Sequence, residues 1–253
     1  MIRAGLAAAL ICTSASAADM PAPKSGLEYV SPETRALQAD DFANPGMLWV
    51  SGGADLWRAA TGTSGKSCQS CHGDAKQSMR GVAARYPLYE PKTKRPIDLQ
   101  VRINQCRTER QGAKGLGFES EELLSLGAYV AHQSRGLPVK PPQDERLTPF
   151  IKNGEKLYFQ RMGQIDISCA ACHNAHAGQR LSGNLIPQAH PTGYPIYRLE
   201  WQSAGSLQRR LRGCMSAVRA EPFAYGAAEM VDLELYLMSR AAGLPIETPG
   251  VRP

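Results

Sequence analysis

No segment of the sequence is apolar enough to cross a membrane. The apolar run near the start, residues 4–12, is far shorter than the ~20 residues that a spanning helix needs. The alternation of apolar and polar residues that marks half-buried strands is also scarce, which argues against an all-β fold. The basic residues accompany no motif known to read nucleic acid, so a nucleic-acid-binding protein is not expected. The composition is that of an ordinary globular protein, with 43% hydrophobic and 21% charged residues.

The first 17 residues have the pattern of a secretory signal peptide. Arg3 gives a positive start, residues 4–12 form the apolar stretch, and Ala15-Ser16-Ala17 offers small residues for cleavage. The sequence therefore predicts cleavage after Ala17 and a soluble product exported to the periplasm. The formal net charge of +6 favours anionic substrates or acidic partner surfaces.

Seven cysteines are present, and removal of the signal peptide would take away Cys12. An even number in an exported protein usually indicates disulfides. Four of the remaining six, however, lie in two motifs, Cys68-Gln-Ser-Cys71-His72 and Cys169-Ala-Ala-Cys172-His173. In c-type haem proteins the two thiols of this motif add to the haem vinyl groups, and the histidine binds the iron. We therefore predict two covalently bound haem c groups, attached through Cys68, Cys71, Cys169 and Cys172, with His72 and His173 as axial ligands.

Three other interpretations of these motifs are weaker. A thioredoxin-like redox pair needs a strand–helix setting, and here the motif occurs twice, each time followed by histidine. A zinc site would combine both motifs or add further cysteines and histidines nearby. A disulfide that spans only two residues is strained and rare.

The two halves of the chain resemble each other well beyond the motifs. Residues 86–89 (Tyr-Pro-Leu-Tyr) parallel residues 194–197 (Tyr-Pro-Ile-Tyr). Residues 99–106 and 207–214 share leucine, glutamine, arginine and cysteine in the same register. The segments that end in Gly-Leu-Pro, at Pro138 and Pro245, also correspond. The chain is therefore one domain copied once, with a net insertion after the second motif.

The duplication sets the predicted domain boundaries. After the signal peptide, residues 18–47 form a lead-in, 48–137 the first domain, 138–146 a proline-rich linker and 147–253 the second, catalytic domain. Ser120 is a predicted N-cap of a helix that carries Leu123, Leu126 and Val130 on one face, and residues 150–159 form another predicted helix. The predicted fold is mainly α, with two tandem cytochrome c-like domains related by internal duplication.

The second axial ligand of each haem is less obvious from the sequence. Methionine is usual and raises the reduction potential. The candidates are Met79, Met162, Met215, Met230, Met238, His132, His176, His190, Cys106 and Cys214. Of these only Cys106 and Cys214 occupy matching positions in the two halves, so we predict both as axial iron ligands. A Cys106–Cys214 disulfide is the alternative, and Met215, whose counterpart is Arg107, is the main rival in the second half.

Cysteine ligation would direct the function away from simple electron transfer. An anionic sulfur stabilises ferric iron and lowers the potential. A cysteine held at a haem is also placed to carry out sulfur chemistry.

Taken together, the two motifs, the Arg102-x-x-x-Cys106 and Arg210-x-x-x-Cys214 pairs and the segment 212–223 resemble the SoxA family, the larger subunit of the SoxAX cytochrome complex. The resemblance covers nearly the whole mature chain and matches the two-haem type. It implies an L-cysteine S-thiosulfotransferase that couples thiosulfate oxidatively to a cysteine of the SoxYZ carrier protein. Electrons would leave through haem to the SoxX subunit.

The resemblance also implies residue roles. Cys214 would carry a persulfide as the catalytic intermediate, and Arg210 would bind the substrate. The first haem, with His72 and Cys106, would be remote from the reaction. These roles suit the residue types, because arginine offers forked donors to sulfonate oxygens and Arg210 precedes Cys214 by one helical turn.

Other charged residues near Cys214 leave alternatives open. Arg209, Arg210, Arg212 and Arg219 could instead bind haem propionates or lie on a solvated face, and His176 or His190 could act as an acid or base. A non-enzymatic dihaem periplasmic electron-transfer cytochrome is the alternative function. A sensor that binds thiosulfate without consuming it is a third.

Overall fold

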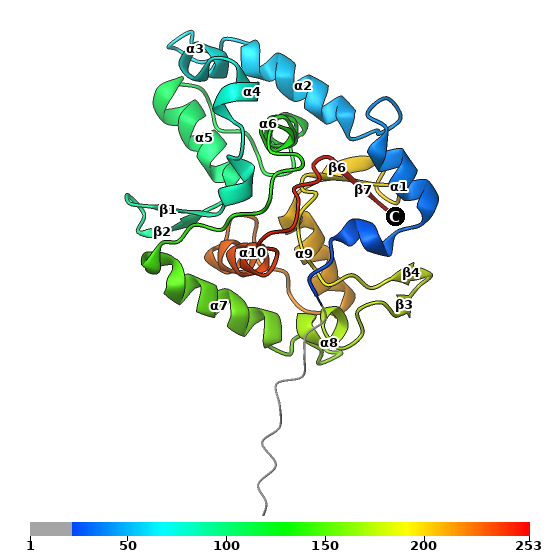
Figure 1. Ribbon diagram of the computed structural model, residues 1–253. Coiled ribbons are helices and arrows are strands. Elements are labelled where there is room, and N and C mark those ends of the chain that lie inside the picture. The colour runs from blue at the N-terminus through cyan, green and yellow to red at the C-terminus, as the bar shows by residue number, and fades with distance from the viewer. Residues whose placement is uncertain (1–21) are drawn as a thin grey trace, which may run out of the picture.

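A computed structural model describes residues 22–253, and it is mainly helical, as the sequence predicts (Figure 1). The predicted signal peptide lies outside the described residues. The α-helices are α1 (Pro32–Ala39), α2 (Met47–Arg58), α3 (Cys68–His72), α4 (Ala75–Ser78), α5 (Leu99–Arg110), α6 (Glu121–His132), α7 (Thr148–Phe159), α8 (Cys169–His173), α9 (Leu207–Ala217) and α10 (Ala228–Arg240). The strands are β1 (Leu88–Glu90), β2 (Arg95–Ile97), β3 (Arg180–Leu181), β4 (Asn184–Leu185), β5 (Ile196–Arg198), β6 (Ser203–Gly205) and β7 (Gly250–Arg252). Short 3₁₀ helices cover Gly26–Tyr29, Ala83–Arg85 and Glu145–Leu147.

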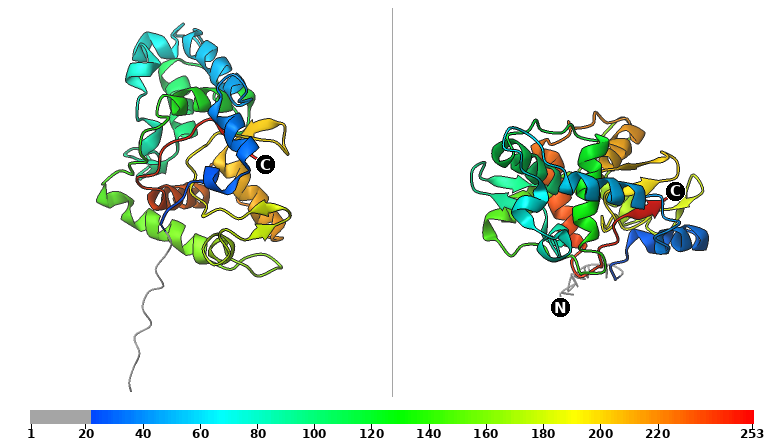
Figure 2. Two further views of the ribbon diagram at one scale, coloured as in Figure 1. Left: turned by 45° about the vertical axis from the view of Figure 1, so that its right-hand side comes forward. Right: turned by 90° about the horizontal axis from the view of Figure 1, so that it is seen from above.

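The same succession of elements occurs in both halves, which confirms the predicted tandem fold. A long helix (α2 or α7) leads to a short helix that holds the Cys-x-x-Cys-His motif (α3 or α8). An antiparallel strand pair follows (β1–β2 or β5–β6), then the helix with the matched cysteine (α5 or α9) and a closing helix (α6 or α10). The two halves lie side by side (Figure 2).

Side-chain caps fix the starts of the helices that carry the candidate ligands. Ser67 and Ser168 cap the two motif helices, each accepting a backbone hydrogen bond from the residue three positions later. Asp98 caps α5 and Ser206 caps α9 in the same way. The predicted N-cap at Ser120 is present and accepts from the backbone N–H of Leu123.

In each half, two long helices cross closely at a glycine, and this contact holds the half together. In the first half α2 crosses α6 at Gly53, where an added Cβ would lie 2.1 Å from the backbone oxygen of Ser125. In the second half α7 crosses α10 at Gly154, where an added Cβ would lie 2.0 Å from the backbone oxygen of Asp232. These glycines and their partners occupy corresponding positions in the duplication, so the helices of the two halves pack in the same way.

The ends of the two halves pair with each other across a local two-fold relation. Pro138 and Pro245, which correspond in the duplication, form an antiparallel bridge. The backbone N–H of Gly136 donates to Ile246 (2.8 Å), and that of Ile246 donates back to Leu137 (2.9 Å). The start of the predicted linker is therefore part of the contact between the halves.

The described part of the predicted lead-in packs against the second half. Helix α1 contacts strand β7, which itself pairs in parallel with β5. The backbone N–H of Lys24 donates to Gln188 (2.7 Å), and the Asn44 amide donates to the backbone oxygen of Pro249 (3.0 Å). Residues before α2 thus help to enclose the second half.

The predicted insertion is also located. Thirteen residues lie between His72 and Tyr86, whereas 20 lie between His173 and Tyr194, and the exposed β3–β4 hairpin occupies the longer segment. No helix within residues 22–253 is both long and apolar enough to span a bilayer.

Two buried carboxyl groups meet where the halves join. The amide of Gln208 on α9 donates to the side chain of Asp98 (2.7 Å) and accepts from the backbone N–H of Gly226 (2.7 Å). Burial raises the pKa of Asp98 to about 6. Burial, and secondly the negative charge of Asp98, raise the pKa of Glu234 on α10 well above its usual value.

We expect Gly53→Ala to destabilise the first half, because the new methyl group would meet backbone that cannot move without separating α2 from α6. The loss should be about 1–3 kcal/mol of unfolding free energy, measured by denaturant or thermal unfolding of the haem-loaded protein. The neighbouring substitution Gly52→Ala is the control, since its Cβ would lie 3.5 Å from the Ser125 hydroxyl and should leave the stability unchanged or raise it. Equal losses for the two variants would contradict the close crossing at Gly53.

We also expect Glu234→Gln to stabilise the protein more at pH 8 than at pH 5. The raised pKa means that, as the pH rises, the unfolded chain releases the proton of Glu234 at a lower pH than the folded protein does. The free energy of unfolding therefore falls as the pH rises from about 4 through the folded-state pKa. Removal of the charge should add about 1–3 kcal/mol at pH 8 and little at pH 5. The exposed substitution Glu229→Gln on the same helix should show no such pH dependence in thermal unfolding.

Candidate functional site

A cavity of about 430 Å³ lies in the second half and is lined by residues of both α8 and α9. The two cysteines and the histidine of the second motif line it, and Cys214 of α9 lines it as well. Its volume falls in the range of roughly 300–1,000 Å³ that cofactor pockets occupy. The cavity therefore suits a group of haem size between the motif and Cys214.

His173 is prepared to bind a metal through one ring nitrogen. Its Nδ1 lies 2.7 Å from the backbone oxygen of Pro187, so Nδ1 carries the proton and donates it. The opposite nitrogen, Nε2, is left with a free lone pair, as in metal-binding histidines oriented by a second hydrogen bond. Burial lowers the pKa of His173, which favours the neutral, ligating form.

Cys214 lies close to the motif cysteines across the cavity. Burial, and next the charge of Cys214, raise the pKa of the Cys169 thiol to about 11. Cys214 is half-buried, one turn before the end of α9. A histidine from α8 and a thiol from α9 thus line one cavity, which is the arrangement that two axial ligands require.

Arg210 is the basic residue that enters this cavity from the same helix as Cys214. Burial alone would lower the pKa of Arg210, but the charges of Cys214, Tyr194 and Glu200 raise it above its usual value. None of the ion pairs within residues 22–253 involves Arg210. The guanidinium is therefore a cation beside a thiol, with no carboxylate bound to it in the described part of the chain.

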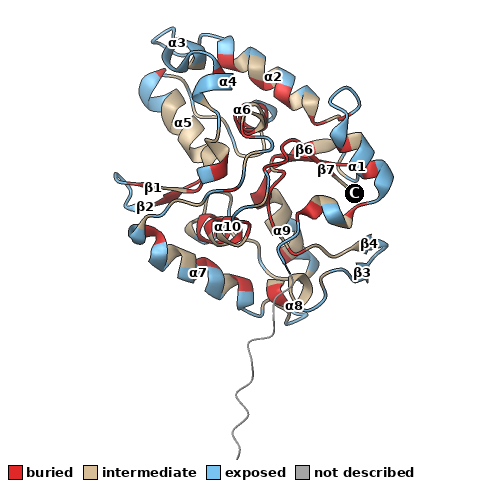
Figure 3. Cartoon of the chain, viewed as in Figure 1, coloured by how far each residue is buried: buried red, intermediate tan, exposed pale blue. Residues whose placement is uncertain are grey.

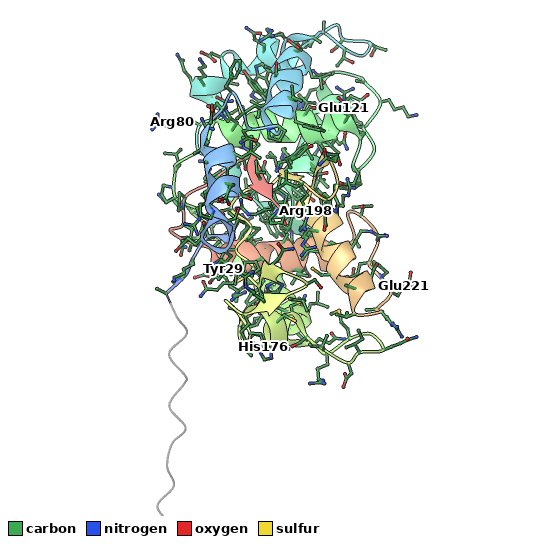
Figure 4. The ribbon with its side chains drawn as sticks, turned by 90° about the vertical axis from the view of Figure 1, so that its right-hand side faces the viewer. Tyr29, Arg80, Glu121, His176, Arg198 and Glu221 are labelled. Carbon is green, nitrogen blue, oxygen red and sulfur yellow. The ribbon has the colours of Figure 1, made fainter. Side chains whose placement is uncertain are left out.

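A second arginine, Arg198 at the end of β5, lines the same cavity. Only 8% of its surface is exposed, and Figure 4 shows it in the middle of the molecule. Its Nη2 atom lies 3.0 Å from Glu200, whereas its buried Nε has no hydrogen-bond partner. Arg252 lies nearby, but it is held by Glu247 at 2.5 Å.

The other arginines of the sequence cluster have structural contacts. Arg209 stacks on the ring of Trp201, 4.2 Å from its centre, and Arg212 donates to the backbone oxygen of Phe223 and lies over Tyr225. Arg219 reaches only Gln164, at 3.5 Å. Of the four arginines around Cys214, Arg210 is the one that lines the cavity.

Of the histidine and methionine candidates considered from the sequence, some line the cavity and others do not. His190 lines the cavity, with its Nδ1 2.7 Å from the backbone oxygen of Lys24, whereas His176 is exposed near the end of the molecule (Figure 4). Met215 and Met230 belong to the hydrophobic core of the second half, and Met238 to a core shared with the end of the first. Met215 and Met162 also line the cavity, so these two methionine candidates reach it. Met79 packs against the core of the first half.

The first half repeats this arrangement with more exposure. Cys71 and His72 are exposed on α3, whereas α8 is mostly half-buried (Figure 3). Cys106 on α5 lies close enough to Cys71 for their charges to interact, and burial raises the pKa of Cys106. The indole of Trp57 packs 5.7 Å from the His72 ring. The predicted ligands of the first haem thus also lie together, nearer to solvent.

The arginine of the first half is neutralised. Arg102, the counterpart of Arg210, lies 2.8 Å from Glu90, whose side chain is only 7% exposed. The phenol of Tyr86, the counterpart of Tyr194, lies close enough to Arg102 to help raise the pKa of that guanidinium. Arg102 is therefore occupied by protein groups, in contrast to Arg210.

No disulfide joins the six cysteines within residues 22–253; Cys106 and Cys214 are both free thiols. The disulfide considered from the sequence is thus absent from the described structure, and the assignment of both residues as iron ligands stays a prediction.

Sequence reasoning missed Arg198 and the enclosing residues from the N-terminal segment. Arg198 follows the repeated Tyr-Pro-x-Tyr segment by one residue, where the first half has Glu90. The exchange of charge sign at matched positions was the signal that could have found it. Tyr29, by contrast, reaches the cavity from a segment without a counterpart, so no repeat comparison could have indicated it.

Comparison with known proteins places the site in a family context. The family described as SoxA/TsdA, cytochrome c domain, matches residues 52–139 and 153–246. The L-cysteine S-thiosulfotransferase subunit SoxA of Pseudaminobacter salicylatoxidans is 42% identical over 90% of this chain and 80% of its own length. The subunit of the same name from Rhodovulum sulfidophilum is 36% identical over the same shares. The crystal structure of SoxXA from P. pantotrophus matches with a TM-score of 0.88 and 36% identity, over 91% of this chain and 87% of that chain.

Proposed function

This chain belongs to the SoxA/TsdA cytochrome c family, and we propose that the cavity of its second half is the catalytic centre of an L-cysteine S-thiosulfotransferase. The chain is a subunit of a thiosulfate-transferring haem enzyme, and its cofactor is of the haem c type. The names of its relatives do not favour the alternative of a non-enzymatic electron carrier.

We propose two covalently bound haems, one in each half. Support comes from two Cys-x-x-Cys-His motifs on corresponding helices, each with a matched cysteine close to it. His72 and Cys106 would hold the first iron, and His173 and Cys214 the second. When bound, the second haem supplies a route for electrons out of the site.

The proposed reaction couples thiosulfate to a cysteine of the SoxYZ carrier. The carrier loses one S–H bond and gains one S–S bond to the outer sulfur of thiosulfate, and one proton and two electrons leave. The electrons pass to the cytochrome subunit SoxX, whose presence with SoxA in one solved complex supports it as the partner here. We place the reaction in the periplasm, in line with the signal-peptide pattern.

Cys214 would carry the reacting sulfur as a persulfide. Its terminal sulfur anion bonds to the outer sulfur of thiosulfate with loss of two electrons. The carrier thiolate then attacks that outer sulfur, releases the persulfide and leaves as the S-thiosulfonate. Cys214 is suited to this role because it lies at a cavity rather than in the core.

Arg210 would bind the sulfonate oxygens of thiosulfate while this exchange takes place. The single observation that carries the assignment is that a half-buried guanidinium without an ion-pair partner in the described chain lies one helical turn from Cys214 in a cavity. A cation held in a cavity in this way favours an anionic ligand, and its forked donors match a sulfonate.

The first half lacks such a free cation. Arg102 is paired with Glu90, so an anion would have to displace a buried carboxylate. We therefore assign the first haem no part in substrate binding, and at most a minor part in electron transfer.

We expect Cys214→Met to abolish thiosulfate coupling, because methionine can still bind iron but cannot form a persulfide. The matched variant Cys106→Met should retain coupling. Formation of the carrier S-thiosulfonate, followed by intact mass spectrometry, measures the activity. The mass of the untreated protein should show two haems and one extra sulfur. Persistent coupling in Cys214→Met, with its spectrum showing methionine at the iron, would contradict the role of Cys214.

We expect Arg210→Gln to raise the KM for thiosulfate by roughly 10- to 100-fold, since one charge-assisted contact contributes on that scale. The adjacent substitution Arg209→Gln removes the same charge from a side chain that contacts Trp201, Ser203 and Ala204 and does not line the cavity, and its KM should change less than threefold. Equal effects would mean that general positive charge, and not a bound contact, attracts the substrate.

A further inference from the structure

Resting on the function proposed above, we propose that Arg198 is a second cationic contact for thiosulfate, holding the sulfonate oxygens together with Arg210. Neither the family motifs nor the repeat pattern assigns a role to this residue. The two arginines come from different elements, β5 and α9, and line one cavity with Cys214.

The duplication shows how this pair arose. Arg102 and Glu90 of the first half correspond to Arg210 and Arg198 of the second, since each pair stands at the same distance from its Tyr-Pro segment and its cysteine. In the first half the half-buried Arg102 forms an ion pair at 2.8 Å with the buried Glu90. In the second half the same two positions carry like charges. The net charge of the two positions is thus zero in the first half and +2 in the second.

The residues around Arg198 do not fully neutralise its positive charge. Glu200 contacts Nη2 at 3.0 Å, but its side chain is 51% exposed, so water screens the pair. The guanidinium carbon lies 5.1 Å from the centre of the Trp201 ring, which orients it without neutralising it. The Nε–H is buried and has no partner. An unpaired buried donor is costly, and a ligand oxygen would remove that cost.

Arg198, Arg210 and Cys214 line one cavity. Burial and then the positive charge of Arg210 lower the pKa of Arg198, so the two guanidinium groups are close enough to repel each other. A substrate that reaches Cys214 would therefore enter the cavity that both arginines line.

Two guanidinium groups match the charge of thiosulfate better than one. The dianion placed between them would relieve their mutual repulsion as well as satisfy their donors. A singly charged anion would relieve less of it. This predicts selection for dianions with sulfonate-like oxygens.

A haem propionate is the other carboxylate or sulfonate-like group that Arg198 could contact, and the test separates the two sources. Thiosulfate affinity is measured on the haem-loaded complex without the carrier, by calorimetry, so binding is observed with no turnover. Haem content, the absorption spectrum and the reduction potential of the same samples report contact with a propionate.

We expect Arg198→Gln to weaken thiosulfate binding by roughly 10- to 100-fold with haem content and spectrum unchanged, and Arg198→Lys to restore part of the affinity. Arg198→Glu, which recreates the pair of the first half, should weaken it further. Glu200→Gln is the control and should bind thiosulfate as tightly as the native protein or more tightly. Unchanged affinity in Arg198→Gln, or a shifted potential with unchanged affinity, would overturn the proposal.

The same experiment separates this inference from the proposed function. If the native complex binds thiosulfate through Arg198 but transfers nothing to the carrier, the function fails and the binding contact stands. If transfer proceeds and Arg198→Gln has a native KM and affinity, the contact fails and the function stands.

Discussion

Both candidate sites depend on a close crossing of two helices at a glycine, α2 with α6 in the first half and α7 with α10 in the second. Gly53 and Gly154 allow the backbones to approach until a methyl group would not fit. That approach helps to position α3 and α8, because each motif helix follows the crossing helix after a loop of nine residues. The closing helix in turn supports the helix with the matched cysteine. The separation between histidine and cysteine, which an iron must bridge, is thus set by a packing contact several residues away from either ligand.

One scaffold used twice has been given two electrostatic environments. Both halves keep the caps, the strand pair and the cysteine helix, but they differ at the position of Glu90 and Arg198. In the first half the buried carboxylate of Glu90 neutralises the half-buried Arg102, which stabilises that half and closes it to anions. The second half keeps two cations close together instead. Such an arrangement lowers stability unless a ligand is bound, which is typical of a site under functional constraint.

Much of this architecture could be predicted because its signals are local. The Ser120 cap, the helix near residues 150–159 and the matched cysteines follow from spacing and repeat register, and each lies in the predicted element. The parallel pairing of β7 with β5 could not be predicted, because three-residue strands carry almost no periodic signal. Nor could the packing of residues 22–44 on the second half, which depends on single hydrogen bonds between residues more than 150 positions apart. Arg198 is an intermediate case. Its position next to the repeated Tyr-Pro-x-Tyr segment can be read from the sequence, but its role can be inferred only by comparison with Glu90 at the matched position.

Enclosure explains why the second half suits chemistry and the first does not. The N-terminal segment, the β3–β4 hairpin and the C-terminal strand surround the second cavity, and the hairpin and N-terminal segment have no counterpart in the first half. Charges act over longer range and with greater strength when water is excluded. A guanidinium such as Arg210 would contribute little at the exposed surface beside α3, where solvent screens it. The added segments therefore matter as much as the added charge, because they lower the polarity of the cavity in which, on the proposed function, two arginines and one sulfur would act on a small dianion.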